Sequence, residues 1–102
     1  MNKQKAKESL IDMLCTINNK SEMLFFLNQV LTKAEIGDLV DRIRIYEGLT
    51  REQLPQRECA KILNVSISKV TRGASNIRNH KHKEYWRQKF NSASESFDDP
   101  AP

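Results

Sequence analysis

Polar and basic residues recur at helical spacing between Gln56 and Asn79, and their side chains have the chemistry to bind a nucleic acid duplex. Guanidinium and ammonium groups bind backbone phosphates, whereas hydroxyl and amide groups reach the edges of bases. Apolar residues fill the opposite stripe of the same stretch, which predicts two short amphipathic helices. The outward residues of this pattern are Arg57, Lys61, Ser68, Lys69, Thr71, Arg72, Ser75 and Arg78.

A tight turn is predicted between these two helices. Asn64 tolerates the left-handed backbone conformation that ends a helix abruptly, and Ser66 offers a side-chain oxygen to cap the next helix. Ala60 is small enough to let the helices approach closely. The apolar stripe comprises Cys59, Leu63, Ile67, Val70, Ala74 and Ile77. Two helices held at a fixed angle by a short turn form a helix-turn-helix unit, here over residues 56–79.

The positive charge of the chain is concentrated in this region. Of 102 residues, 17 are Lys or Arg and 13 are Asp or Glu, which gives a net charge of +4. Ten of the basic residues but only three acidic ones fall between Arg51 and Phe90. Such a basic block indicates a polyanionic partner, and double-stranded DNA suits the helix-turn-helix on which the charges lie. A solvated basic face without a partner is the plainer alternative.

Length and composition favour one domain over residues 1–91 with a modest core. No apolar run is long enough to span a bilayer, and the polar start of the chain lacks the apolar segment of a signal peptide. We therefore expect a cytoplasmic protein without a membrane partner. Cys15 and Cys59 fall at apolar helical positions, and we interpret both as small core residues that form no disulfide.

An all-α fold of six helices without strands is predicted from apolar periodicity and capping signals. Thr32 and Glu35 form a capping box, Gly48 predicts a helix end, and Pro55 suits the first turn of the next helix. The predicted helices cover about 9–17, 21–31, 32–48, 56–63, 66–79 and 80–91. The acidic, proline-ended segment 92–102 is predicted to be disordered.

Catalysis has little support in this sequence. It shows no nucleophile with a base at motif spacing, no phosphate-binding loop and no paired carboxylates in an apolar setting, so we expect no enzyme. His80 and His82 lack the cysteine or carboxylate neighbours of a metal site, and no metal is expected. Tyr85, Trp86 and Phe90 are interpreted as the packing face of the last helix, not as platforms for stacking bases.

The segment from Leu31 to Arg78 resembles the Trp repressor family. The similarity is carried by the pattern IxxxTRGxxxI at 67–77, by QRE at 56–58 and by RIRIYEGL at 42–49. This combination is more specific than a helix-turn-helix pattern alone. The resemblance implies an intertwined six-helix homodimer that acts as a transcriptional repressor and binds palindromic operator DNA when its corepressor, L-tryptophan, is bound.

The resemblance also implies a tryptophan site. Arg42 and Arg72 would flank the indole ring, as the affinity of guanidinium planes for aromatic faces explains, and Arg72 would also bind the ligand carboxylate. Gly73 matches the residue that lets the helix approach the ligand. Asn76 stands where the family more often has a serine that faces the amino group of the ligand. Contacts made by the partner subunit in the family match Thr32 and the carbonyl groups around Gln29 and Leu31.

On the DNA side, the resemblance assigns Arg57 to a guanine edge, which suits a bidentate guanidinium contact. The start of the recognition helix would meet bases directly or through water, and it comprises Ile67, Ser68, Lys69 and Thr71. Lys69 replaces a threonine that is usual in the family and adds a positive charge to the DNA-binding surface. Phosphates would be bound by Gln56, Lys61 and Arg78.

Three functions of different classes remain open on the sequence. The first is the tryptophan-gated repressor. The second is a helix-turn-helix regulator of the same superfamily that does not need tryptophan, which Asn76 makes conceivable. The third is an interaction module whose basic face binds an acidic partner. Within the proposed ligand site, the plain alternatives are an ion pair between Arg42 and Asp38 and a solvated Arg72.

Overall fold

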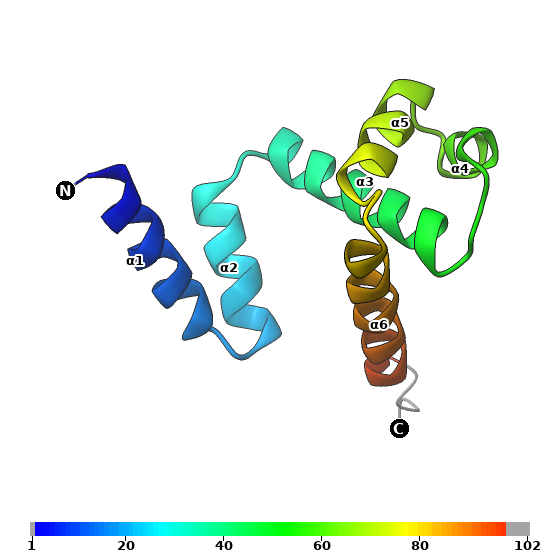
Figure 1. Ribbon diagram of the computed structural model, residues 1–102. Coiled ribbons are helices and arrows are strands. Elements are labelled where there is room, and N and C mark those ends of the chain that lie inside the picture. Colours follow the sequence, from blue (N-terminus) through cyan, green and yellow to red (C-terminus); the bar gives the residue numbers. More distant parts are fainter. Residues whose placement is uncertain (1, 98–102) are drawn as a thin grey trace. The chain divides into compact units, whose positions relative to one another are not determined.

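Six α-helices make up residues 2–97, the part of the chain that the computed structural model describes (Figure 1). They are α1 (Lys3–Cys15), α2 (Lys20–Val30), α3 (Lys33–Thr50), α4 (Gln56–Leu63), α5 (Ile67–Asn76) and α6 (His80–Phe97). The predicted all-α class is confirmed for this range. None of the helices in it is long and apolar enough to cross a membrane.

The chain divides into two compact units, Met1–Ile36 and Gly37–Pro102, with the boundary inside α3. α1 and α2 contain no buried residue, whereas the buried clusters of the described residues all lie in the second unit. The single domain over residues 1–91 stays a prediction.

Asparagine side chains begin both helices of the first unit. The Oδ1 atoms of Asn2 and Asn19 each accept a hydrogen bond, 2.8 Å long, from the backbone amide three residues further on. As a result, α1 begins at Lys3, before the predicted start near residue 9, and α2 is capped by Asn19 instead of Ser21. Asparagine caps a helix as well as serine does, and the Lys, Gln, Ala and Glu residues at positions 3–8 favour helix.

Apolar side chains of α1 and α2 remain exposed. On α2, Leu24 and Phe25 are 62% and 65% exposed. The wide apolar face predicted for this helix is therefore not covered by its own unit. Other large apolar residues exposed on the two helices are Leu10, Ile11, Met13 and Val30.

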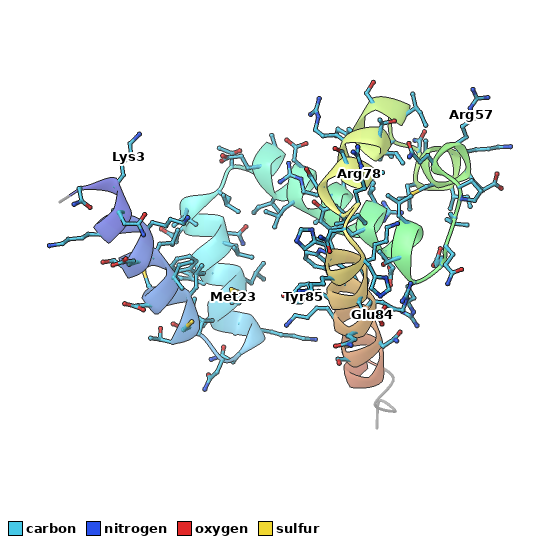
Figure 2. All side chains as sticks on the ribbon, viewed as in Figure 1. Lys3, Met23, Arg57, Arg78, Glu84 and Tyr85 are labelled. Atoms are coloured by element: carbon cyan, nitrogen blue, oxygen red, sulfur yellow. The ribbon has the colours of Figure 1, made fainter. Side chains whose placement is uncertain are left out.

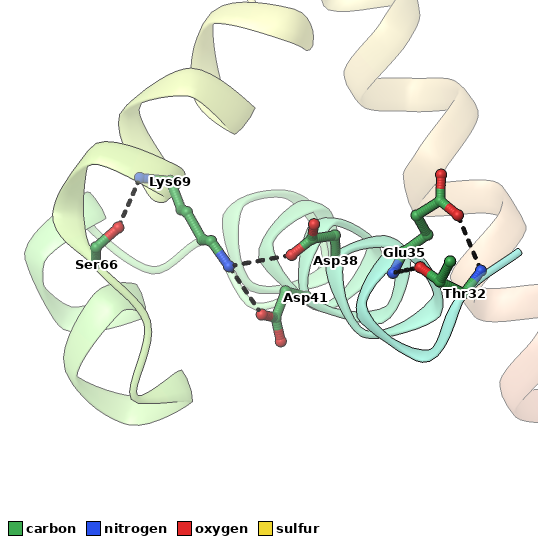
Figure 3. Close-up of polar contacts among 6 residues, drawn as sticks. All are labelled: Thr32, Glu35, Asp38, Asp41, Ser66 and Lys69. Carbon is green, nitrogen blue, oxygen red and sulfur yellow. Dashed lines mark hydrogen bonds and ion pairs between the residues drawn. The ribbon is translucent and has the colours of Figure 1, made fainter.

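The predicted capping box begins α3. The Thr32 amide donates a hydrogen bond to Glu35 Oε1 at 2.8 Å, and the Glu35 amide donates to Thr32 Oγ1 at 3.1 Å (Figure 3). The predicted helix end at Gly48 is wrong, because α3 continues to Thr50. A Cβ atom at Gly48 would lie 2.9 Å from Cys59 Sγ, so this glycine allows α4 to approach α3 and does not end the helix.

Two buried clusters lie in the second unit. The first joins α3, α4 and α5, and the second joins α3, the residue after α5 and α6. In the second cluster the ring of Trp86 packs against Tyr46, with ring centroids 5.0 Å apart, as expected for the packing face of the last helix. The buried members are Ile45, Cys59 and Val70 in the first cluster, and Tyr46, Ile77 and Phe90 in the second.

Some residues predicted for the core lie outside it. Both cysteines are free, but only Cys59 is buried, whereas Cys15 is exposed on α1 in the unit that has no buried residue. Ile67, the first residue of α5, is 47% exposed, and Tyr85 on α6 is 55% exposed. The predicted apolar stripe of α5 is therefore buried at Val70 but open at the start of the helix.

The last helix, α6, continues past Asn91, where the sequence predicted its end, to Phe97. The residues from 92 to 97 include neither proline nor glycine, so the formed helix extends through them without interruption. The predicted disorder of segment 92–102 therefore does not hold for residues 92–97. The rest of that segment lies outside the described residues.

Candidate functional site

The predicted pair of short helices is present as α4 and α5, joined by a tight turn. Asn64 ends α4 in the left-handed conformation, with φ 56° and ψ 48°. The Val65 amide then donates to the Ala60 carbonyl at 3.0 Å, which satisfies a carbonyl that the helix end leaves free. Ser66 Oγ accepts from the Lys69 amide at 3.2 Å and caps α5. The predicted roles of Asn64 and Ser66 are thus confirmed.

Cys59 and Val70 hold α4 and α5 together from the inside, and both side chains are 0% exposed. Burial raises the pKa of the Cys59 thiol, and the negative charge of Glu52 adds to that shift. The thiol therefore remains neutral and packs as a small apolar group. On the outside of the pair, Thr71 Oγ1 donates to Gln56 Oε1 at 3.1 Å.

All residues predicted to bind DNA are exposed, and all of them lie in the second unit. Arg57 extends outward from α4 (Figure 2). Because α5 ends at Asn76 and not at Asn79 as predicted, Arg78 lies in the connection to α6. The exposed set is Gln56, Arg57, Lys61, Ile67, Ser68, Lys69, Thr71 and Arg78.

A pocket of about 120 Å³ lies between α3 and α5. Each of its walls is a single helical stripe, with residues at spacing i, i+3, i+4 and i+7. The wall from α3 comprises Asp38, Asp41, Arg42 and Ile45, and the wall from α5 comprises Lys69, Arg72, Gly73 and Asn76. Ser68, Thr71 and Ser75 fall on a different face of α5 by the same spacing.

The residues predicted to bind tryptophan fall in both compact units. Those that line the pocket are Arg42, Arg72, Gly73 and Asn76. Those in the first unit are Gln29, Leu31 and Thr32. The two pocket arginines come from facing helices, and both are exposed.

In the structure, Gly73 has a packing role that the resemblance does not imply. A Cβ atom at this position would lie 2.8 Å from Ile45 Cγ2, and Ile45 is a buried residue of α3. The missing side chain therefore lets α5 approach α3 closely. The resemblance assigned the glycine to close approach of the ligand, whereas the contact in the structure is between the two helices that wall the pocket.

The sequence did not predict that acidic residues line the pocket. An ion pair between Asp38 and Arg42 was left open as an alternative on the sequence. In the structure the carboxylate of Asp38 binds Lys69 of α5 at 3.5 Å, and Asp41 binds the same ammonium group at 3.3 Å (Figure 3). The hydrogen bond that Lys69 donates to Asp41, together with the charge of that carboxylate, raises the pKa of Lys69. The i, i+3, i+4 spacing of Asp38, Asp41 and Arg42 was the available signal for a shared face.

A second polar contact links the same two helices. Asn76 Nδ2 donates to Tyr46 Oη at 3.2 Å, and Tyr46 is itself held by burial and by its packing against Trp86. α3 and α5 are thus connected by Lys69 near the start of α5 and by Asn76 at its end.

Two short helices with a buried contact, a left-handed turn and an exposed row of polar and basic side chains define a helix-turn-helix protein. Comparison with known proteins gives the family. The family model described as "Trp repressor protein" matches residues 2–90. A "Trp operon repressor homolog" of Xylella fastidiosa (strain M23) is 42% identical over 90 residues, which cover 88% of this chain and 98% of the relative. The chain belongs to the Trp repressor family, a family of regulators.

More distant relatives carry the same description. The homolog of Vibrio atlanticus (strain LGP32) is 28% identical over 71 residues, which cover 70% of this chain and 72% of the relative. That of Vibrio campbellii (strain ATCC BAA-1116) is 33% identical over 61 residues, which cover 60% and 59% of the two chains. No solved structure matches the chain. Within residues 2–97, no group of three or more His, Cys, Asp or Glu side chains could hold a metal ion.

Proposed function

We propose that this protein is a cytoplasmic homodimeric repressor that binds palindromic operator DNA with L-tryptophan as its corepressor. The proposal depends chiefly on α5, because this helix contributes both to the pocket and to the exposed surface of the helix-turn-helix unit. One face of this helix lines the pocket with Arg72, and another face exposes Ser68 and Thr71 to solvent. A ligand in the pocket therefore contacts the same rigid element that presents DNA-binding side chains.

The chemistry of the pocket suits an aromatic amino acid. Arg42 and Arg72 come from facing helices, and guanidinium groups bind both the faces of aromatic rings and carboxylates. In this proposal the two arginines flank the indole ring, and Arg72 also binds the carboxylate. Gly73 and Asn76 line the same pocket. The partner subunit contributes Thr32 and the backbone carbonyls around Gln29 and Leu31.

The helix-turn-helix unit supplies the contacts to DNA. Arg57 binds a guanine edge, and the start of α5 enters the major groove with Ile67, Ser68, Lys69 and Thr71. Gln56, Lys61 and Arg78 bind phosphates. As in other dimeric helix-turn-helix repressors, among which the Trp repressor is itself a known example, the two recognition helices contact half-sites about 34 Å apart. Tryptophan favours this arrangement only to the extent that it binds it better than the alternative.

The exposed apolar faces of α1 and α2 support the homodimer. Large contiguous apolar patches on a soluble protein mark interaction surfaces, and a second copy of the chain would cover these. Family membership points to the same assembly.

A gel-shift experiment on palindromic duplex DNA, with and without L-tryptophan, tests the proposed function. We expect tryptophan at millimolar concentration to strengthen the retarded complex. The logarithm of the affinity should fall by about 0.9 per neutralised phosphate per log unit of salt, because bound cations are released from the DNA. If no duplex is retarded even at low salt, the repressor function is overturned and an acidic partner becomes the better candidate.

A second candidate function is a helix-turn-helix regulator that does not need tryptophan. It is favoured by one observation, which is that side chains of the protein itself, Lys69 and Asn76, link α3 and α5. Such links contribute to the position of the recognition helix without a contribution from tryptophan. Equal retardation with and without tryptophan, combined with no calorimetric heat at millimolar ligand, would decide for this candidate.

A further inference from the structure

An amino group of the protein itself occupies the acidic part of the pocket. Lys69 Nζ lies 3.3 Å from Asp41 Oδ2 and 3.5 Å from Asp38 Oδ1, and all three residues line the cavity (Figure 3). A primary ammonium group is also what an amino acid ligand carries. The contact between Lys69 and the two carboxylates is therefore chemically equivalent to a contact that a bound amino acid could make.

Charges of both signs line the pocket. On α3, Arg42 directly follows Asp41, whereas on α5 both charged residues are positive, with Arg72 about one turn beyond Lys69. An amino acid carries its ammonium and its carboxylate on a single carbon atom. The resemblance places a contact to the amino group at position 76, but Asn76 is neutral and its Nδ2 atom donates to Tyr46 Oη at 3.2 Å. Asp41 and Asp38 are the acidic residues that line the pocket, so they offer the ammonium a charged partner that Asn76 does not.

A ligand ammonium can bind Asp38 and Asp41 only when the ammonium of Lys69 leaves them, because both groups compete for the same carboxylate oxygens. Lys69 can move readily, because it is a flexible chain with 45% of its side-chain surface exposed. Exposed ion pairs of this kind are weak, so displacing the lysine costs little.

We propose that Asp38 and Asp41 bind the ammonium group of an amino acid ligand, and that Lys69 occupies their carboxylates until the ligand displaces it. These three residues then determine that the pocket prefers a zwitterionic amino acid to the corresponding acid without an amino group. The inference rests on the proposed function, because it concerns the same pocket. Displacement also frees the ammonium of Lys69, in the first turn of α5 beside Ser68, to bind a DNA phosphate.

Isothermal titration calorimetry with two ligands tests the inference on the full chain. The ligands are L-tryptophan and indole-3-propionate, which lacks the amino group. In Lys69→Met, tryptophan should bind about twofold to fivefold more tightly because its competitor is gone, whereas indole-3-propionate should bind no more tightly. In the double variant Asp38→Asn with Asp41→Asn, tryptophan should bind more weakly and indole-3-propionate should not.

Lys81→Met, which removes an exposed lysine from α6, is the matched control and should leave both affinities unchanged. Far-UV circular dichroism establishes that each variant is folded. If both ligands respond alike to each substitution, the assignment of the ammonium site is wrong, while the tryptophan pocket itself stands. If tryptophan produces no heat with the wild type or with Lys69→Met, both the corepressor function and this inference fail.

Discussion

Arg42 and Arg72 belong to neither buried cluster, although they line the pocket between α3 and α5. Both residues are exposed, so the packing of the core does not depend on them. Lys69 differs, because it is bound to two carboxylates of α3. At the scale of single residues, the pocket therefore contains two exposed arginines outside the core and one lysine that is ion-paired within the protein.

Replacing Arg72 by alanine should remove most of the tryptophan affinity and leave the fold intact. A lost charged hydrogen bond weakens binding by roughly 1.5–3 kcal/mol, so the dissociation constant should rise about tenfold to a hundredfold or more. Calorimetric titration measures the affinity, and the midpoint of urea unfolding reports on the fold. Unchanged affinity would show that the ligand lies elsewhere.

Replacing Arg57 by alanine should reduce discrimination between operator sequences. A bidentate contact to guanine contributes roughly 1–3 kcal/mol of preference over the wrong base. Binding of the variant to a selected operator and to versions with single base changes measures this loss. Lys61→Ala is the matched comparison, because a phosphate contact should weaken all duplexes equally. If Arg57→Ala behaves in the same way as Lys61→Ala, Arg57 is also a phosphate contact.

At the scale of elements, glycine decides how closely the helices around α3 can pack. Gly48 admits the Cys59 sulfur of α4, and Gly73 admits the Ile45 side chain of α3. Gly37, in contrast, has nothing within 4 Å of the place where its Cβ would lie. All three glycines lie within α3 or α5, but only Gly48 and Gly73 are needed for close helix packing.

This contrast predicts opposite effects of two alanine substitutions. Gly73→Ala should lower the free energy of unfolding by about 1–2 kcal/mol, because overpacking against the fixed side chain of Ile45 outweighs the gain in helix propensity. Gly37→Ala should raise it by about 0.5–1 kcal/mol, because alanine restricts the unfolded chain more than glycine does. Urea unfolding at one protein concentration measures both. Equal stabilisation by the two substitutions would contradict the close packing of α3 and α5.

Sequence signals that act over three or four residues predicted their elements well. The Thr32–Glu35 capping box, the left-handed Asn64 and the Ser66 cap are all present, because each depends on its immediate neighbours alone. Gly48 was misread as a helix end because its role depends on Cys59, which is distant in sequence.

The candidate site was only partly predictable for the same reason. Arg42 and Arg72 were recognisable from the family pattern, and the structure places them on facing walls of one pocket. The ion pairs of Lys69 with Asp38 and Asp41 join α5 to α3, and no local spacing rule pairs residues that far apart. Cys15 was assigned to a core because its periodicity is apolar, but periodicity does not tell which partner covers a helix face.

At the scale of the whole molecule, the two compact units differ in how completely they bury apolar surface. The second unit contains both buried clusters, whereas α1 and α2 in the first unit have no buried residue. A helix pair with such a surface gains stability mainly by packing against a partner. The proposed homodimer supplies that partner.

Phe25→Asp should therefore dissociate the homodimer. Phe25 is among the most exposed apolar residues of α2, and each buried phenylalanine contributes roughly 1.5–3 kcal/mol. A symmetric dimer loses this contribution twice, so its dissociation constant should rise by about a hundredfold or more. Sedimentation equilibrium measures the change. Asn28→Asp adds the same charge to the same helix and should leave the dimer intact; if the two variants sediment alike, the apolar face of α2 is not the interface.

The short helix α5, from Ile67 to Asn76, contributes to three parts of the molecule within ten residues. Val70 lies in the core, Arg72 lines the pocket, Ser68 and Thr71 are exposed on the surface proposed to bind DNA, and Lys69 lies where the last two surfaces meet. In the proposed repressor, ligand choice and operator choice are thus not independent traits. During evolution, or in a library randomised at position 69, a change in the ligand to which this repressor responds would tend to come together with a change in the operator that it binds.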